Sequence, residues 1–163
     1  MTANCQLTTL CYLERDDKYL MLHRVSKKND INKDKWIGVG GHFEDLESPE
    51  ECVKREVLEE TGYDIPTEAF EYRGIITFIS DKGDYELMSL FTAPCPDGDP
   101  ISCNEGELVF VGKKDVYDLN LWEGDKIFFR LLEERRDFFS LKMAYDTDDN
   151  LREAVLDGRN IND

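Results

Sequence analysis

Short apolar runs separated by polar turns alternate along this chain with two longer segments of helical pattern. Residues 7–14 and 19–25 are two apolar runs joined by the polar turn Arg15-Asp16-Asp17-Lys18, and they predict a pair of strands. The charged stretch 26–34 is expected to be a loop. Further strands are predicted over residues 35–41, 72–80, 85–93, 107–111, 138–145 and 151–155, with turns at 81–84 and 146–150 and a loop at 95–100. Strands interleaved with helices favour an α/β fold in which both faces of a mixed sheet are covered.

The segment between Ser48 and Gly62 carries the start and stop signals of a helix. Ser48 suits the N-cap and Pro49 the first helical position, while Glu51 completes a Ser-x-x-Glu capping box. Gly62 supplies the C-terminal stop, so a helix of about four turns is expected. A second, amphipathic helix is predicted over residues 124–135.

Three glutamates share one face of the first predicted helix. Glu56, Glu59 and Glu60 are spaced i, i+3 and i, i+4, whereas Val53 and Val57 fall on a neighbouring apolar strip. Like charges this close repel one another, and a divalent cation with a preference for oxygen ligands reverses that effect. A solvated acidic surface is the alternative interpretation for an arbitrary cluster of this kind.

Composition limits the classes of partner. The chain has 163 residues, which suit a single domain spanning 1–163. Its formal net charge of −16 argues against binding a nucleic acid polymer or an anionic membrane surface. No apolar stretch reaches the length of a membrane span and no signal-peptide pattern begins the chain, so we expect a cytoplasmic protein. The five cysteines are expected to be reduced thiols, without zinc, because they lack ligand spacing: Cys5, Cys11, Cys52, Cys95 and Cys103.

The two histidines, His23 and His42, are too few to suggest a histidine-based triad. We expect His42 to lie beside the glycines and glutamates described next rather than to take part in chemistry.

Between Gly41 and Tyr63, glycine, glutamate and arginine residues follow one another at a characteristic spacing. Gly41 is followed after five residues by Glu47, and after seven more by Arg55-Glu56-Val57-Leu58-Glu59-Glu60-Thr61-Gly62-Tyr63. This resembles the Nudix box, the sequence signature of hydrolases that cleave nucleoside diphosphates linked to another moiety. Only the last position departs, since Tyr63 stands where an aliphatic residue is usual; a tyrosine can still bury its ring.

The resemblance extends over nearly the whole chain, to about residue 150, and is to the MutT-type 8-oxo-dGTP diphosphatases, especially their Gram-positive bacterial branch. It rests on the segments 7–11, 20–24, 35–41, 104–106 and 122–125 together with the box. It implies the Nudix α/β/α sandwich with a mixed central sheet.

The resemblance also assigns the metal site. Glu56, Glu59 and Glu60, with the carbonyl of Gly40, match the positions that hold Mg²⁺ in the family, with Mn²⁺ as the alternative ion, and Glu105 matches a loop glutamate that joins the metal or activates water. Arg55 beside Glu56 can hold that carboxylate in one orientation. The catalytic residues that the resemblance implies are Arg55, Glu56, Glu59 and Glu105. Both Glu56 and Glu105 remain candidates for the general base.

Substrate contacts follow from the same resemblance. Gly41 is expected to bind the substrate, and Arg24 matches a basic residue near the substrate phosphates, although Arg24 also suits a charged strand end. Trp122 and Asp125 match a segment that stacks on and hydrogen-bonds to an oxidised purine in vertebrate relatives, and Trp122 has a core anchor as its alternative role.

Two positions depart from the family pattern. Ile37 occupies the place of a base-reading asparagine in the vertebrate enzymes, and isoleucine cannot make that hydrogen bond. Leu46 stands where a glycine commonly precedes the glutamate of the box, which affects the loop and not a ligand.

The predicted activity is Mg²⁺-dependent hydrolysis of 8-oxo-dGTP to 8-oxo-dGMP and pyrophosphate by a monomer or homodimer. The alternatives are hydrolysis of another dNTP, ADP-ribose or a dinucleotide, or a nucleotide-binding module without turnover. Such modules usually lose glutamates of the box, and this chain keeps all of them.

Overall fold

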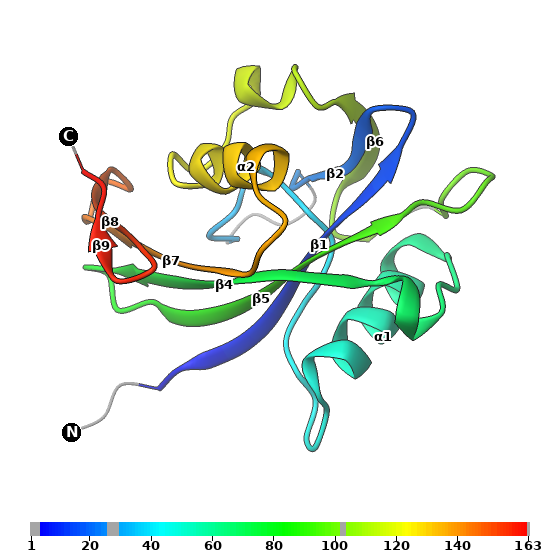
Figure 1. Cartoon of the computed structure of the whole chain (residues 1–163), viewed down its shortest axis with the longest axis horizontal. Helices are drawn as coiled ribbons and strands as arrows, with labels where there is room; N and C mark the ends of the chain where they lie inside the picture. Colours follow the sequence, from blue (N-terminus) through cyan, green and yellow to red (C-terminus); the bar gives the residue numbers. More distant parts are fainter. Residues whose placement is uncertain (1–3, 26–29, 102–103, 163) are drawn as a thin grey trace.

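A mixed β-sheet lies between two α-helices in the computed structural model, which describes residues 4–25, 30–101 and 104–162 (Figure 1). Helix α1 (Pro49–Thr61) covers one face of the sheet and α2 (Asp125–Glu134) the other. The strands are β1 (Gln6–Arg15), β2 (Lys18–His23), β3 (Trp36–Ile37), β4 (Glu71–Ser80), β5 (Tyr85–Pro94), β6 (Glu107–Gly112), β7 (Phe139–Tyr145), β8 (Leu151–Leu156) and β9 (Arg159–Asn160), with 3₁₀ turns η1 (Thr67–Ala69) and η2 (Val116–Asp118). The predicted α/β class is confirmed.

The strand order in the sheet is β3-β2-β1-β5-β4-β7-β8-β9, and β6 pairs with β2. The β1–β5 and β4–β7 pairs are parallel, whereas the other pairs are antiparallel. Because β7 joins β4, the C-terminal strands extend the same sheet. No helix in the described part of the chain is long and apolar enough to cross a bilayer.

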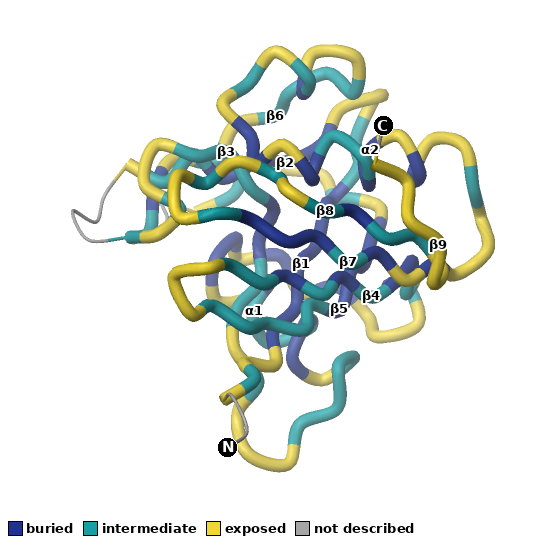
Figure 2. Tube along the Cα trace, turned by 90° about the vertical axis from the view of Figure 1, so that its left-hand side faces the viewer, coloured by how far each residue is buried: buried dark blue, intermediate teal, exposed yellow. Residues whose placement is uncertain are grey.

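Two hydrophobic cores fill the two sides of the sheet. The core under α2 contains Tyr12, Phe128 and Phe129, whereas the core under α1 contains Val53 and Val57. Figure 2 shows the buried segments of the strands running through the middle of the molecule, with the turns exposed. The apolar strip predicted for the first helix therefore does pack against the sheet.

The predicted strand over residues 35–41 is shorter in the structure, where β3 covers only Trp36–Ile37. The residues that follow pair with β1 by single bridges instead, Val39 with Cys11 and His42 with Thr8. Gly40 has a φ of 149° and approaches the Thr9 carbonyl so closely that a Cβ there would lie 2.0 Å from its oxygen. The glycines thus bring this segment against β1 and interrupt its regular ladder.

Other sequence predictions agree with the structure to within a few residues at element ends, and three short elements were missed: η1, η2 and β9. Cys5, Cys11, Cys52 and Cys95 are free thiols, while Cys103 and the loop residues 26–29 lie outside the described residues.

Candidate active site

The start and end of α1 are fixed by the groups that its sequence supplies. The Ser48 hydroxyl accepts a hydrogen bond from the Glu51 N–H (3.1 Å), and the Glu51 carboxylate accepts one from the Ser48 N–H (2.9 Å). Gly62 has a φ of 81° and donates its N–H to the Leu58 carbonyl (2.9 Å). The predicted capping box and glycine stop are confirmed, and they fix where α1 begins and ends next to the loop that contains Gly40 and Gly41, the glycine loop.

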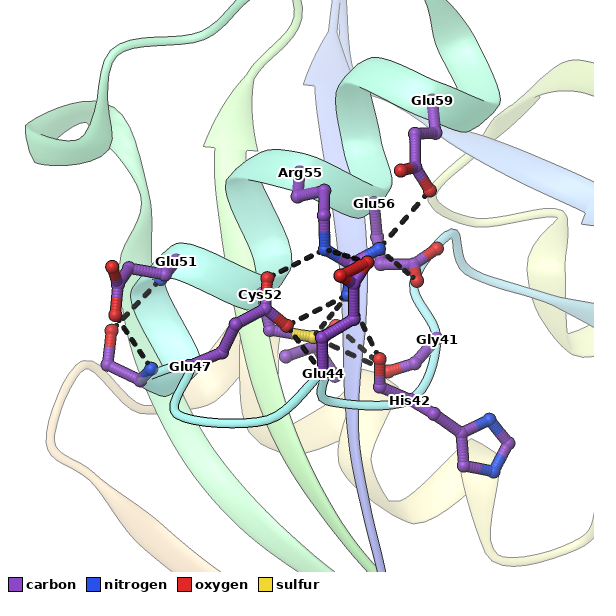
Figure 3. Close-up of polar contacts among 11 residues, drawn as sticks. Gly41, His42, Glu44, Glu47, Glu51, Cys52, Arg55, Glu56 and Glu59 are labelled. Atoms are coloured by element: carbon purple, nitrogen blue, oxygen red, sulfur yellow. Dashed lines mark hydrogen bonds and ion pairs between the residues drawn. The ribbon is translucent and has the colours of Figure 1, made fainter.

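Arg55 joins α1 to the loop before it (Figure 3). Its guanidinium donates two hydrogen bonds to the Glu47 carboxylate, at 2.6 and 2.9 Å, and one to the His42 carbonyl (3.0 Å). It also donates to Glu56 (2.9 Å) and Glu59 (3.2 Å). The expected contact between Arg55 and Glu56 is therefore present, and the paired bonds to Glu47 fix the plane of the guanidinium.

Electrostatics explain why this arginine stays charged and in place. The Arg55 hydrogen bonds hold the pKa of Glu47 at about 2, and the same bonds raise the pKa of Arg55. The His42 carbonyl accepts a hydrogen bond from Arg55, while the His42 imidazole is exposed. The structure thus places His42 beside the site, as expected from the sequence.

The remaining carboxylates differ in burial along the helix face. Glu60 is buried and accepts a hydrogen bond from the Gly40 N–H (2.7 Å), Glu56 is partly buried, and Glu59 is exposed. A Cβ on Gly41 would lie 2.6 to 2.7 Å from the carboxyl atoms of Glu56, so this glycine makes room for that carboxylate. The two adjacent glycines consequently allow the loop to contact two glutamates of α1.

Burial and like charge raise the pKa of two of these carboxyls. For Glu56 burial is the largest cause, and Glu59 and Glu105 also raise its pKa. Burial raises the pKa of Glu60 as well, followed by its hydrogen bond with the carboxyl of Glu105. Glu105 therefore does meet the helix glutamates, although it lies 45 residues from Glu60 along the chain.

These residues fit a hard divalent cation. Mutual repulsion among carboxylates in a partly desolvated site is the condition that such an ion relieves. Among the described residues, no three acidic, histidine or cysteine side chains stand close enough to hold an ion by themselves. A Mg²⁺ site with one or two carboxylates matches that arrangement, because Mg²⁺ usually keeps several waters and takes substrate phosphate oxygens as further ligands.

A cavity of about 470 Å³ extends from this cluster across the sheet. Its lining includes Gly40, Gly41 and Glu105 together with Trp122 and Asp125. All five were singled out from the sequence, and the fold brings them to one cavity. Glu56, Glu59 and Glu60 are not among the residues that line it, so the helix carboxylates stand beside the cavity.

Trp122 and Asp125 are largely buried where they meet the cavity. Trp122 is 4% exposed, packs edge-to-face on Phe78 and Tyr145, and has the Lys35 ammonium 5.0 Å from its ring centroid. It thus serves as a core anchor as well as a wall of the cavity. Burial raises the pKa of Asp125 to about 8, and the charge of Lys35 lowers it less.

Arg24 lies just after β2 and lines the same cavity. Its guanidinium donates to Asp30 (2.6 Å) and lies 3.7 Å from the carboxylate of Glu105. Arg24 can therefore be a charged residue at the end of a strand or a residue that contacts the substrate phosphates. Its side chain is paired with Asp30 and also lies beside Glu105.

Two contacts of the site were missed from the sequence. Glu47 was recognised as part of the motif without its role as the partner of Arg55, and Asn32, which accepts a hydrogen bond from Trp122, was not singled out. The presence of Glu47 and Arg55 in the same motif was the available signal for the first. Nothing in the sequence pairs Asn32 with a residue 90 positions away.

Comparisons with known proteins agree with this geometry. The NUDIX domain family model matches residues 6–132. The oxidized purine nucleoside triphosphate hydrolase of Mus musculus is 31% identical over 114 residues, which are 69% of this chain and 71% of that protein. The protein of the same name from Danio rerio is 29% identical over the same shares of each chain.

Solved structures show the same fold. The MutT protein from Bacillus halodurans superposes with a TM-score of 0.80 at 29% identity, covering 93% of this chain and 97% of that one. The MutT protein from Methanosarcina mazei gives a TM-score of 0.71 at 21% identity, covering 82% of this chain and 96% of that one, and supports the fold alone. With its family signature matched and the box folded around Arg55, the chain belongs to the Nudix hydrolases.

Proposed function

We propose that this Nudix hydrolase cleaves 8-oxo-dGTP to 8-oxo-dGMP and pyrophosphate and so removes an oxidised nucleotide from the pool. The observation that carries the proposal is that Gly40, Gly41 and Glu105 line the same cavity as Trp122 and Asp125. A nucleoside triphosphate needs a polar site for its phosphates and an aromatic or hydrogen-bonding site for its base. The names of the mouse and zebrafish relatives support this substrate class. The similarity to the MutT protein of Bacillus halodurans supports the Gram-positive bacterial branch of the MutT-type enzymes.

Glu56, Glu59, Glu60 and Glu105, with the Gly40 carbonyl, would supply the ligands for Mg²⁺ or Mn²⁺, with one or two carboxylates on an ion and with waters and substrate phosphate oxygens completing its shell. When bound, the ion neutralises phosphate charge and lowers the pKa of a coordinated water. Water forms a bond to a phosphorus of the triphosphate, the bridging P–O bond breaks, and pyrophosphate leaves. Glu56 or Glu105 accepts the proton of the water, and Arg55 keeps Glu56 in orientation through its 2.9 Å hydrogen bond.

The proposed enzyme is a single domain over residues 1–163 that acts on free nucleotides, in the cytoplasm, as a monomer or homodimer. A related substrate is the second candidate, because Ile37 lines the cavity without the amide expected for base recognition. On that alternative the chain hydrolyses another dNTP, ADP-ribose or a dinucleotide with the same carboxylates.

The test is release of pyrophosphate, or of the corresponding phosphate product, from 8-oxo-dGTP, dGTP, the other dNTPs, ADP-ribose and a dinucleoside polyphosphate. Each is assayed with Mg²⁺ and with EDTA. A kcat/KM for 8-oxo-dGTP well above that for dGTP, lost in EDTA, supports the proposal. Similar values for all dNTPs contradict the oxidised-base preference, and no hydrolysis of any compound contradicts the enzymatic assignment in favour of a binding module.

Glu59→Gln tests the metal assignment. We expect turnover to be abolished while the fold is kept, because Glu59 is exposed and its loss leaves no cavity in either core. Hydrolysis rates and circular dichroism of the variant provide the measurement, with the exposed Glu68→Gln as the matched control. Undiminished hydrolysis in Glu59→Gln would rule the assignment out.

A further inference from the structure

Asn32 has a fixed amide orientation in the loop that borders the cavity. Its Oδ1 accepts a hydrogen bond from Nε1 of Trp122 (2.8 Å). An indole N–H is a donor only, so the atom of the amide that faces it must be the oxygen. Turning the amide over would set its NH₂ against the indole N–H and leave two donors opposed.

The amide NH₂ of Asn32 is therefore the group left for another molecule. Asn32 is partly buried and lines the 470 Å³ cavity. Within residues 4–25, 30–101 and 104–162, no acceptor forms a hydrogen bond with its Nδ2. A donor at the wall of a cavity favours a ligand that presents an acceptor there.

The backbone holds Asn32 in this place. Its N–H donates to the Asp30 carboxylate (3.0 Å), and its carbonyl accepts from the Lys35 N–H (2.8 Å). Asp30 is itself paired with Arg24, and Trp122 is buried in the core. Asp30 and Lys35 thus hold the backbone of Asn32, and Trp122 holds its amide oxygen, before a ligand binds. Recognition of a hydrogen-bonding group requires such a preorganised side chain.

Several other side chains that line the cavity cannot donate a hydrogen bond to a ligand. Ile37, Phe78 and Met88 line the cavity with apolar surface, and the Thr8 hydroxyl already donates to Glu86 (2.7 Å). The amide that Ile37 cannot supply is available from Asn32, five positions earlier in the chain.

We propose that Asn32 is a specificity residue that donates to a carbonyl of the nucleobase and so selects 6-oxopurines over 6-aminopurines. The inference rests on the proposed function and deepens it. Because Trp122 fixes which end of the amide faces the cavity, the same side chain cannot turn over to accept from an adenine amino group. Guanine, 8-oxoguanine and hypoxanthine present the matching acceptor.

The test compares dITP with dATP, whose bases differ in the hydrogen-bonding groups at positions 6 and 1 and lack other substituents. Asn32→Asp keeps an oxygen for the Trp122 N–H and replaces the NH₂ by an acceptor. We expect wild type to prefer dITP, and the ratio of kcat/KM for dITP to that for dATP to fall by about tenfold or more in Asn32→Asp. The added negative charge affects both triphosphates alike, so the ratio isolates the base.

Asn32→Ala removes the donor and the contact with Trp122 together, and in it we expect the ratio to fall toward one. A merely structural Asn32 predicts an unchanged ratio in Asn32→Asp, and that result would overturn the inference. So would a wild-type preference for dATP.

Equilibrium binding separates this inference from the proposed function. Calorimetric titration of dITP and dATP, with Ca²⁺ in place of Mg²⁺, measures base preference without turnover. If wild type hydrolyses neither nucleotide but binds dITP more tightly, and Asn32→Asp loses that preference, the enzymatic proposal fails and the role of Asn32 stands. Equal affinities, or no binding of either nucleotide, would overturn the inference.

Discussion

Arg55 contacts more carboxylates than its single charge can neutralise. Its guanidinium lies within 3.3 Å of oxygens of Glu44, Glu47, Glu56 and Glu59. Planar donors on a rigid fork can serve several acceptors at fixed angles, which an ammonium cannot do. The sequence predicted the contact between Arg55 and Glu56 correctly, because the motif places them side by side. The hydrogen bonds from Arg55 to Glu47, which tie α1 to the loop before it, became evident only from the fold.

Arg55→Lys should lower kcat/KM for the preferred nucleotide by about 10- to 100-fold, the usual cost of removing a partner that orients metal ligands. Lysine keeps the charge but loses the paired bonds to Glu47 and the simultaneous contact with Glu56. Steady-state kinetics at saturating Mg²⁺ provide the measurement. Arg130→Lys, an exposed change on α2, is the control; equal rates in the two variants would contradict the orienting role.

Asp125 should make stability fall as pH rises. Its pKa is about 8 in the folded protein, against an ordinary value of 3.8, because burial disfavours the carboxylate. Between these pH values the folded protein keeps a proton that the unfolded chain has released, so the free energy of unfolding decreases with pH, by up to about 1.4 kcal/mol per pH unit, and levels off above pH 8.

Asp125→Asn should remove this component. Urea unfolding between pH 5 and 9, an interval of about four units across the window, measures it. The variant should gain stability relative to wild type as pH rises, whereas the exposed Asp118→Asn should follow wild type. Parallel pH profiles for wild type and Asp125→Asn would show that the carboxyl is not desolvated by folding.

At the scale of the element, α1 and the loop before it act as one unit. The helix was predicted almost to the residue because its stop and start depend on local groups, Ser48, Glu51 and Gly62. Leu46 marks where the loop departs from the usual pattern, with a φ of 69° and a fully exposed side chain. The left-handed conformation explains why glycine is common at this position.

Leu46→Gly should therefore stabilise the protein by about 1 kcal/mol, since it relieves strain and removes no buried contact. At this chain length that corresponds to a rise in Tm of about 2–4 °C. Asp45→Gly, at an exposed neighbour outside the left-handed region, is the control and should lower Tm slightly. A lower Tm in Leu46→Gly would mean that the Leu46 side chain makes a stabilising contact.

The whole molecule carries a formal net charge of −16, and Glu56, Glu60 and Glu105 influence one another where α1 meets the glycine loop. A divalent cation should bind the folded chain more tightly than the unfolded one, because folding alone assembles Glu56, Glu60 and Glu105. Mg²⁺ should then raise Tm in proportion to the logarithm of its concentration above Kd.

Scanning fluorimetry against MgCl₂, with NaCl at matched ionic strength, tests this expectation. Glu56→Gln should reduce the gain from Mg²⁺ relative to NaCl, whereas Glu68→Gln should leave it unchanged. Identical curves for the two salts in wild type would contradict a specific divalent site.

The sequence by itself determined the family, the two main helices, most strands and the residues of the box, because capping groups, alternating apolar positions and the Nudix spacing act over a few neighbouring residues. The tertiary structure alone decided what those residues meet. It shortened β3 where Gly40 approaches β1, brought Glu105 to Glu60, and set Asn32 against Trp122. Such contacts depend on sheet order and loop path, which local periodicity does not encode.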